Sequence, residues 1–147
     1  MATTRTAQAI WNGELTTGSG TVSAVSSATF RDLPVSWPAR TEQPDGRTSP
    51  EELLAAAHAS CFAMALSAGL GRAGTPPTRL EVSATVTFAN VNGAWTVTES
   101  RLSVTGTVPG ATAESFRQAA EGAKENCPIS RALKGNVQLS VEAHLAS

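Results

Sequence analysis

At 147 residues the chain is long enough to bury one core, and we expect residues 1–147 to form a single domain. Only 16% of the residues are charged and the net charge is −1, without any block of like charges, which argues against nucleic acid or a membrane as partner. The low share of charge also suggests that a second copy of the chain covers part of the surface.

The first residues carry no apolar leader segment, so we expect a cytoplasmic protein. The chain has two cysteines, Cys61 and Cys127. A permanent structural disulfide is not expected in a reducing compartment. The two thiols are therefore expected to be catalytic, metal-binding or incidental.

The N-terminal third is rich in residues that favour strands. Ala7–Trp11 and Thr21–Phe30 are predicted as strands, with a turn at Asn12-Gly13. The segment Leu33–Arg47 contains three prolines and is predicted to be a loop.

A long helix follows. Ser49 as N-cap, Pro50 as first helical residue and Glu52 as third predict a capping box. The helix is apolar nearly all round over Leu53–Leu70, so it must be buried on most sides. The apolar run Leu53–Ala68 is too short and too rich in alanine to predict a membrane span.

The remaining residues alternate between strand and helix signals. We expect a strand over Leu80–Phe88, a type I′ turn at Asn92-Gly93, a return strand over Trp95–Val108, helices over Thr112–Glu125 and Pro128–Leu133, and a last strand over Val137–Leu145. The order β-β-α-β-β-α-α-β predicts an α+β fold with mostly antiparallel sheet.

Cys127 is the first candidate for chemistry. Pro128 at the first position of a helix puts Cys127 at the N-cap, where the free N–H groups and the helix dipole favour a thiolate. The alternative is a cysteine packed in the core at a kink.

Cys61 lies in the middle of the long helix, where burial would raise the pKa of its thiol. It would need a nearby cation to be a nucleophile, and a small core residue is the alternative. His58 is three residues earlier on the same helix face and either tunes this thiol or is a structural hydrogen-bonder. His58 and Cys61 supply only half of a tetrahedral set and His144 is isolated, so no metal site is predicted.

Glu51 precedes Cys61 by ten residues, which is about 15 Å along a straight helix. It cannot touch Cys61 of its own chain. Either it acts at this thiol from another subunit, or it is a first-turn carboxylate that stabilises the helix dipole.

The chain contains two motifs, TSPEELLAAAHASCFAMALS at Thr48–Ser67 and CPISRALKGNV at Cys127–Val137. Together they resemble the OsmC/Ohr family, the osmotically inducible and organic-hydroperoxide-resistance proteins. His58 and the GTVS at Gly20–Ser23 are more similar to the OsmC branch, whereas the KGN in the second motif is more similar to the Ohr branch. The resemblance covers essentially the whole chain.

The resemblance implies an intertwined homodimer, in which sheets from both chains wrap two long central helices. It also implies a cysteine-based peroxidase without a cofactor, which reduces organic hydroperoxides, and hydrogen peroxide as a further candidate, in oxidative or osmotic stress. By position, Cys61 is the peroxidatic cysteine and Cys127 the resolving one, which reverses the ranking from the helix dipole. An external dithiol, of the lipoyl type, is expected as reductant.

The resemblance implies an arginine and a glutamate beside the peroxidatic thiol. Glu51 matches the glutamate of the PEEL motif, and Arg40 in SWPARTE matches the OsmC-type arginine, with Arg31 and Arg47 as fallback candidates. Arg40 is expected to stabilise the Cys61 thiolate, with Glu51 orienting its guanidinium.

Three apolar residues are predicted to contact the organic part of the substrate, namely Phe62, Met64 and Trp37, and core packing is the alternative for the two aromatic ones. Two other functions remain. A thiol-dependent hydrolase or transferase would need one nucleophile, and a peroxide-sensing dimer would form the disulfide without turnover. No basic stripe or DNA-binding motif supports a transcriptional sensor.

Overall fold

The computed structural model describes residues 1–146. The chain divides into two compact units, Met1–Leu53, called unit 1 below, and Leu54–Ser147, called unit 2. The single domain over residues 1–147 stays a prediction.

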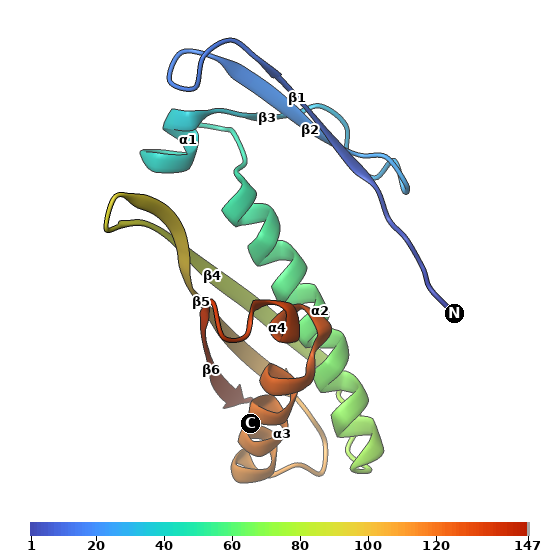
Figure 1. The fold of residues 1–147 in the computed structure, drawn as a ribbon. Helices are drawn as coiled ribbons and strands as arrows, with labels where there is room; N and C mark the ends of the chain where they lie inside the picture. Colours follow the sequence, from blue (N-terminus) through green and yellow to red (C-terminus); the bar gives the residue numbers. More distant parts are fainter. Residues whose placement is uncertain (147) are drawn as a thin grey trace. The chain divides into compact units, whose positions relative to one another are not determined.

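Unit 1 contains an antiparallel sheet of order β1-β2-β3 (Figure 1). Its strands are β1 (Ala7–Asn12), β2 (Ser19–Ala24) and β3 (Leu33–Val35). The predicted strand Thr21–Phe30 is wrong beyond Ala24, because the Ala28 amide donates to the Ala24 carbonyl at 3.1 Å and Ala28 has a φ of +57°. The chain turns there instead of continuing as a strand.

The predicted loop Leu33–Arg47 is also wrong in part, since it contains β3 and the short helix α1 (Trp37–Thr41). β3 pairs with β2, and on its other side Val35 forms an isolated bridge with Thr48, so Pro34 is tolerated at this edge of the sheet. Ser36 caps α1, where its hydroxyl accepts the amide of Ala39 at 3.2 Å. Pro34 and Pro38 thus belong to regular elements, whereas Pro44 lies in the irregular segment after α1.

Unit 1 has almost no core. Among residues 1–53 only Gly20 and Glu51 are buried, and all six residues of β1 are exposed. A Cβ on Gly20 would lie 2.5 Å from the Ile10 carbonyl oxygen and 2.7 Å from the Trp11 ring, so only glycine permits this close approach of β1 to β2.

The long helix α2 (Pro50–Arg72) begins at the predicted residue. The Ser49 hydroxyl accepts the Glu52 amide at 3.1 Å, as an N-cap does. The Glu52 carboxylate accepts from the Thr48 hydroxyl at 2.7 Å. This contact stabilises the first turn of α2 through Thr48, a residue outside the predicted Ser49–Glu52 capping box.

Helix α2 has 23 residues, more than the apolar run Leu53–Ala68, and one window of 18 residues has a mean hydropathy of 1.7. By length and composition it could cross a membrane, so the prediction that this segment is too short is wrong. A core helix passes the same test, and α2 packs one stripe, containing Phe62, Leu66 and Leu70, into the core of unit 2.

Unit 2 contains a second sheet, of order β4-β5-β6 (Figure 1). β4 (Arg79–Val91) and β5 (Ala94–Thr107) are antiparallel, and their predicted turn is confirmed by positive φ angles at Asn92 (+53°) and Gly93 (+87°). β6 (Gln138–Leu145) pairs parallel to β5. The predicted α+β fold with mostly antiparallel sheet is confirmed, with β5–β6 as the parallel pair.

Two helices complete unit 2, namely α3 (Ala113–Asn126) and α4 (Pro128–Leu133). Thr112 caps α3 in a reciprocal capping box with Ser115. These helices and α2 pack with the sheet in one apolar cluster, whose buried members are Phe62, Leu66, Leu70, Leu102, Val104, Val108, Phe116, Ala120, Ala123 and Cys127.

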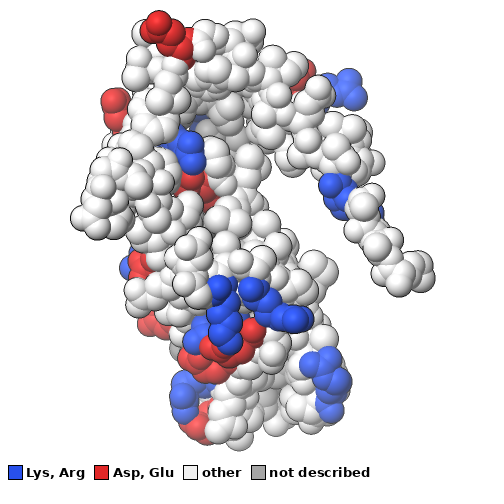
Figure 2. All heavy atoms as spheres, viewed as in Figure 1, with Lys and Arg blue, Asp and Glu red and all other residues white. Residues whose placement is uncertain are grey.

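Charged side chains occur in small groups of mixed sign. On the face in Figure 2 the largest such group lies over α3 and α4. On and next to these two helices, ion pairs join Arg117 with Glu114, Lys124 with Glu121 and Lys134 with Glu125. Because the signs balance, this face has no single-sign patch to attract a polyanion.

Candidate active site

Cys127 ends α3 and caps α4, as predicted. Its backbone is extended, with φ −62° and ψ 138°, and Pro128 follows as a residue of the first helical turn. The Ser130 amide donates to the Cys127 sulfur at 3.3 Å. This thiol is fully buried, so the helix N-terminus holds it inside the core.

Cys61 is half-buried on α2, where it packs against the cluster that contains Cys127, and the two thiols lie close enough to interact. Both thiols are free. They lie 66 positions apart in the sequence, and only the packing of α2 against the α3–α4 junction brings them together.

The surroundings of Cys61 do not activate it. Burial raises the pKa of the Cys61 thiol, and a hydrogen bond with the Ile129 backbone opposes this effect. The hydrogen bond and charge of Cys127 raise the pKa further. Among the described residues of unit 2, no positive charge lowers the pKa of this thiol.

His58 is fully buried, and both of its ring nitrogens have partners. Nδ1 lies 2.7 Å from the Ser100 hydroxyl and Nε2 lies 2.8 Å from the Ser130 hydroxyl. Burial lowers the pKa of His58, so the ring is neutral at pH 7. The structural hydrogen-bonder is thus the alternative that the geometry supports. Within residues 1–146, no cluster of His, Cys, Asp or Glu could hold a metal ion.

Arg40 and Glu51 form a bidentate ion pair in unit 1. The Arg40 Nε donates to Glu51 Oε1 and Nη2 donates to Oε2, each at 2.9 Å. Arg40 comes from α1 and Glu51 from the first turn of α2. Glu51 is 8% exposed, and such a buried carboxylate requires this charge-assisted partner.

The two fallback arginines are placed differently. Arg31 is exposed, and Arg47 is an exposed residue whose Nη1 lies 3.9 Å from the Asp45 carboxylate. Of the three arginines considered from the sequence, the structure therefore pairs Arg40 with Glu51.

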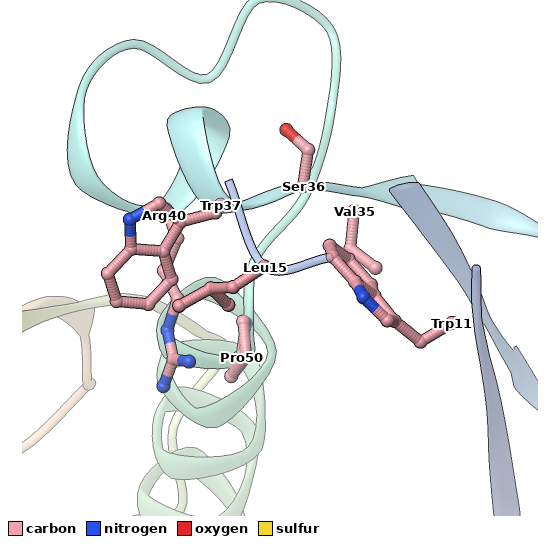
Figure 3. Close-up of a pocket in the computed structure, with 7 residues that line it drawn as sticks. All are labelled: Trp11, Leu15, Val35, Ser36, Trp37, Arg40 and Pro50. Atoms are coloured by element: carbon pink, nitrogen blue, oxygen red, sulfur yellow. The ribbon is translucent and has the colours of Figure 1, made fainter. Parts of the chain in front are cut away.

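A mostly apolar cavity of about 290 Å³ adjoins Arg40 in unit 1 (Figure 3). Its lining residues are Trp11, Leu15, Val35, Ser36, Trp37, Arg40 and Pro50. The Arg40 Cζ lies 5.9 Å from the centroid of the Trp37 ring, within the range of a cation–π contact. Figure 3 shows Leu15 between the two indoles, with Trp37 on one side and Trp11 on the other.

Sequence reasoning found Trp37 and Arg40 but missed the other residues of this cavity. Trp11 carried the clearest signal for a cavity residue, because a large apolar side chain on an exposed strand often marks a binding surface. The register that pairs Trp11 with Gly20 and Gly20 with Val35 was needed to bring these strands together.

The other two residues predicted to contact substrate lie elsewhere. Phe62 is fully buried in the core of unit 2, so its burial supports the alternative of core packing. Met64 is 69% exposed on α2 and lies in a shallow depression with Ser67 and Pro77.

Comparisons with known proteins identify the family of the chain. The model of the OsmC-like protein family matches residues 43–142. The chain is 39% identical over 135 residues to "Peroxiredoxin OsmC" of Escherichia coli strain K12, covering 92% of this chain and 93% of that relative.

Solved structures share the fold. An organic hydroperoxide resistance protein from Elizabethkingia anophelis is 26% identical, with a TM-score of 0.77 over 99% of this chain and all of the other. The organic hydroperoxide resistance protein OhrB of Bacillus subtilis is 24% identical, with a TM-score of 0.74 over 94% of this chain and 97% of the other. Both closely match the fold described above.

Proposed function

The chain belongs to the OsmC branch of the OsmC/Ohr family and is a thiol-dependent peroxidase; from this premise we propose how its own residues perform the reaction. The observation that carries the proposal is the contact between the Cys61 and Cys127 thiols in the core of unit 2. A hydrolase or transferase would need only one of these thiols, and the relatives named as peroxiredoxins do not favour it.

In the proposed reaction the Cys61 thiolate attacks the O–O bond of the hydroperoxide. The bond breaks, the outer oxygen stays on sulfur as a sulfenic acid, and the alcohol leaves with a proton. Cys127 then attacks the Cys61 sulfur, which forms a disulfide and releases water. An external dithiol of the lipoyl type reduces the disulfide by thiol–disulfide exchange and returns both thiols.

Arg40 is the proposed source of positive charge for Cys61. A guanidinium beside the sulfur favours the thiolate and stabilises the charge that develops on the leaving oxygen. The bidentate contact with Glu51 fixes the plane of the guanidinium. Glu51 precedes Cys61 by ten residues on α2, about 15 Å of helix, so we propose that the pair serves Cys61 of a partner chain.

Two features support a homodimer. Helix α2 packs one stripe into unit 2, whereas residues on its other side, such as Ala56, Met64 and Ala68, are exposed. Unit 1 exposes large apolar side chains and has almost no core of its own, with Ile10 at 53% and Leu15 at 55% exposure. An intertwined second copy would cover both surfaces and make residues 1–147 one domain.

The proposed substrate is an organic hydroperoxide. The cavity between Trp11 and Trp37 offers apolar walls to an organic tail, and Arg40 at its edge offers a cation to the peroxide end. We assign no substrate contact to Phe62, which is buried in the core of unit 2, or to Met64, which does not line this cavity. We place the enzyme in the cytoplasm, in defence against oxidative or osmotic stress.

The peroxidase assignment is tested with cumene hydroperoxide and a dithiol reductant. Cys61→Ser should reduce turnover roughly a thousandfold or more, since it removes the nucleophile. Cys127→Ser should still form a sulfenic acid at Cys61 but lose turnover with the dithiol. Ser60→Ala, next to Cys61 on an exposed position, is the control and should keep full activity. Full activity of Cys61→Ser would refute the assignment.

The origin of the arginine is tested by mixing two inactive variants, Cys61→Ser and Glu51→Ala. A site built from both chains regains activity in the mixed dimer, because one of its two sites combines intact Cys61 with intact Glu51. Mixing the double variant with either single variant is the control and should restore none. No recovery after verified subunit exchange would place the whole site in one chain.

A further inference from the structure

A chain of hydrogen bonds leads from Cys127 into the core of unit 2. The Cys127 thiol donates to the Ser130 hydroxyl, with 3.2 Å between Sγ and Oγ. The Ser130 hydroxyl lies 2.8 Å from His58 Nε2, and His58 Nδ1 lies 2.7 Å from the Ser100 hydroxyl. The peroxidase reaction as proposed above gives His58, Ser130 and Ser100 no role.

The directions of these bonds follow from the first one. Since the Ser130 oxygen accepts the thiol proton, its own O–H is available to donate to His58 Nε2. A neutral imidazole that accepts at Nε2 carries its proton on Nδ1 and donates it to the Ser100 hydroxyl. One donor order thus satisfies every atom between Cys127 and Ser100.

No solvent reaches this chain. Cys127, Ser130, His58 and Ser100 are each fully buried. When Cys127 attacks another sulfur, its thiol must release a proton, because the thiolate is the nucleophile. Bulk water cannot take that proton directly, and the acceptor that the thiol already contacts is Ser130.

We propose that Ser130 and His58 form the proton acceptor for the Cys127 thiol in the disulfide-forming step, with Ser130 as the contacting catalytic residue and His58 as the positioning residue behind it. The proposal rests on the proposed peroxidase function and adds the group that activates the resolving cysteine. The Ser130 amide, which also donates to the Cys127 sulfur, stabilises the charge that develops there.

The step balances without any further reactant. As the Cys127 sulfur attacks the Cys61 sulfenic acid, the thiol proton passes to the Ser130 oxygen while the Ser130 proton passes to His58 Nε2. The new S–S bond forms as the S–O bond of the sulfenic acid breaks. The leaving hydroxide takes a proton back along the same relay and departs as water, which leaves His58 neutral again.

His58 is suited to this role because it is neutral. Burial lowers the pKa of the ring, so Nε2 carries a lone pair at pH 7 instead of a proton. Burial is the one cause of this lowering, and no charged group of the elements that pack around the ring contributes to it. The titratable neighbours reached through Ser130 are Cys127 and, beyond it, Cys61.

The test separates the two chemical steps after one equivalent of cumene hydroperoxide. Dimedone trapping followed by mass spectrometry measures the sulfenic acid at Cys61, and loss of free thiol measures the disulfide. Ser130→Ala should leave sulfenic acid formation unchanged and slow disulfide formation about 100-fold. Ser130→Thr keeps the hydroxyl and should restore the wild-type rate, and Ser60→Ala is the control on α2.

His58→Gln distinguishes a relay from a structural bond. Glutamine can replace the hydrogen bonds of the ring but cannot take up a proton at neutral pH. It should therefore slow the disulfide step as Ser130→Ala does. A wild-type rate of disulfide formation in folded Ser130→Ala or His58→Gln would overturn the proposal, as would a failure of Ser130→Thr to recover.

A measurement on the wild-type protein covers the case in which these variants do not fold. Nitrogen-15 NMR of the histidine ring should show a proton on Nδ1 and none on Nε2 at neutral pH. The opposite tautomer would overturn the relay. If the wild-type protein forms no sulfenic acid at Cys61, the peroxidase function fails, and the tautomer still decides whether Ser130 can pass a proton to His58.

Discussion

Units 1 and 2 place their chemical groups in opposite surroundings. In unit 2 the thiols of Cys61 and Cys127 meet at a packed core, and His58 and its serine partners are fully buried. In unit 1 the Arg40–Glu51 pair adjoins an open cavity beside a sheet whose first strand is exposed along its whole length.

This difference matches two chemical requirements. Forming a disulfide needs two sulfurs held in fixed geometry, and a close-packed core provides it. Binding a hydroperoxide and stabilising a thiolate need a cation that a substrate and a second chain can approach. In the proposed mechanism, the two thiols that react with each other lie in unit 2, and the ion pair that serves the substrate adjoins a cavity in unit 1.

The largest effect is expected from breaking the core of unit 2. Phe62→Ala removes a fully buried ring and should lower the free energy of unfolding by about 3–5 kcal/mol. Val91→Ala, at the exposed end of β4, is the control and should change it by less than about 0.5 kcal/mol. Urea unfolding measures both, and equal effects would contradict the distinction between core and surface.

A change at Arg40 in unit 1 should lower activity. Arg40→Ala should lower kcat/KM by about 10²- to 10³-fold, because it removes the positive charge at the developing thiolate and leaving oxygen. Arg40→Lys should recover only part of this, since an ammonium cannot pair with Glu51 in two places. Arg47→Ala is the control, and an equal loss there would move the role to Arg47.

The packing of the sheet in unit 2 predicts a smaller effect. A Cβ on Gly106 would lie 2.5 Å from the Phe116 ring, so Gly106→Ala should lower the free energy of unfolding by about 1–3 kcal/mol. Gly122→Ala is the matched control, since a Cβ on this helical residue meets nothing within 4 Å. It should stabilise by up to about 1 kcal/mol, and a loss at Gly122 would contradict this account.

The smallest effect is a pH dependence from His58. Its pKa is below the ordinary value of 6.5 in the folded state, so the unfolded chain binds a proton that the folded chain does not. This residue therefore costs no stability above pH 6.5, and stability falls as the pH drops below 6.5 toward the folded-state pKa. Unfolding measured at several pH values should show a steeper loss in wild type than in His58→Gln, and equal slopes would contradict it.

Much of the fold could be predicted from local signals. The start of α2, the turn at Asn92-Gly93 and the N-cap at Cys127 each depend on a few neighbouring residues, and all three are confirmed. The elements inside Leu33–Arg47 were missed because a strand of three residues and a helix of five are too short for a periodic pattern.

In the site, too, local sequence signals predicted some features and long-range packing determined the others. Motifs pointed to Cys61 and Cys127, but the contact between the two thiols depends on how α2 packs against the α3–α4 junction. Ser130 was missed although it carried a signal, since a serine three residues after an N-cap is well placed to contact the cap residue. Ser100 had no such signal, because strand pairing alone brings it to His58.

The parallel pairing of β6 with β5 sets when the thiol pair can come into existence. Its register joins Glu99 to Gln138 and Gly106 to Leu145, with α3, Cys127 and α4 all between them in the chain. Contacts between residues far apart in the sequence form late in folding. β6 therefore pairs with β5, and the helices pack on the sheet, after the local hairpin β4–β5 has formed. Until then Cys127 lacks the core contacts that bury it fully in the folded protein.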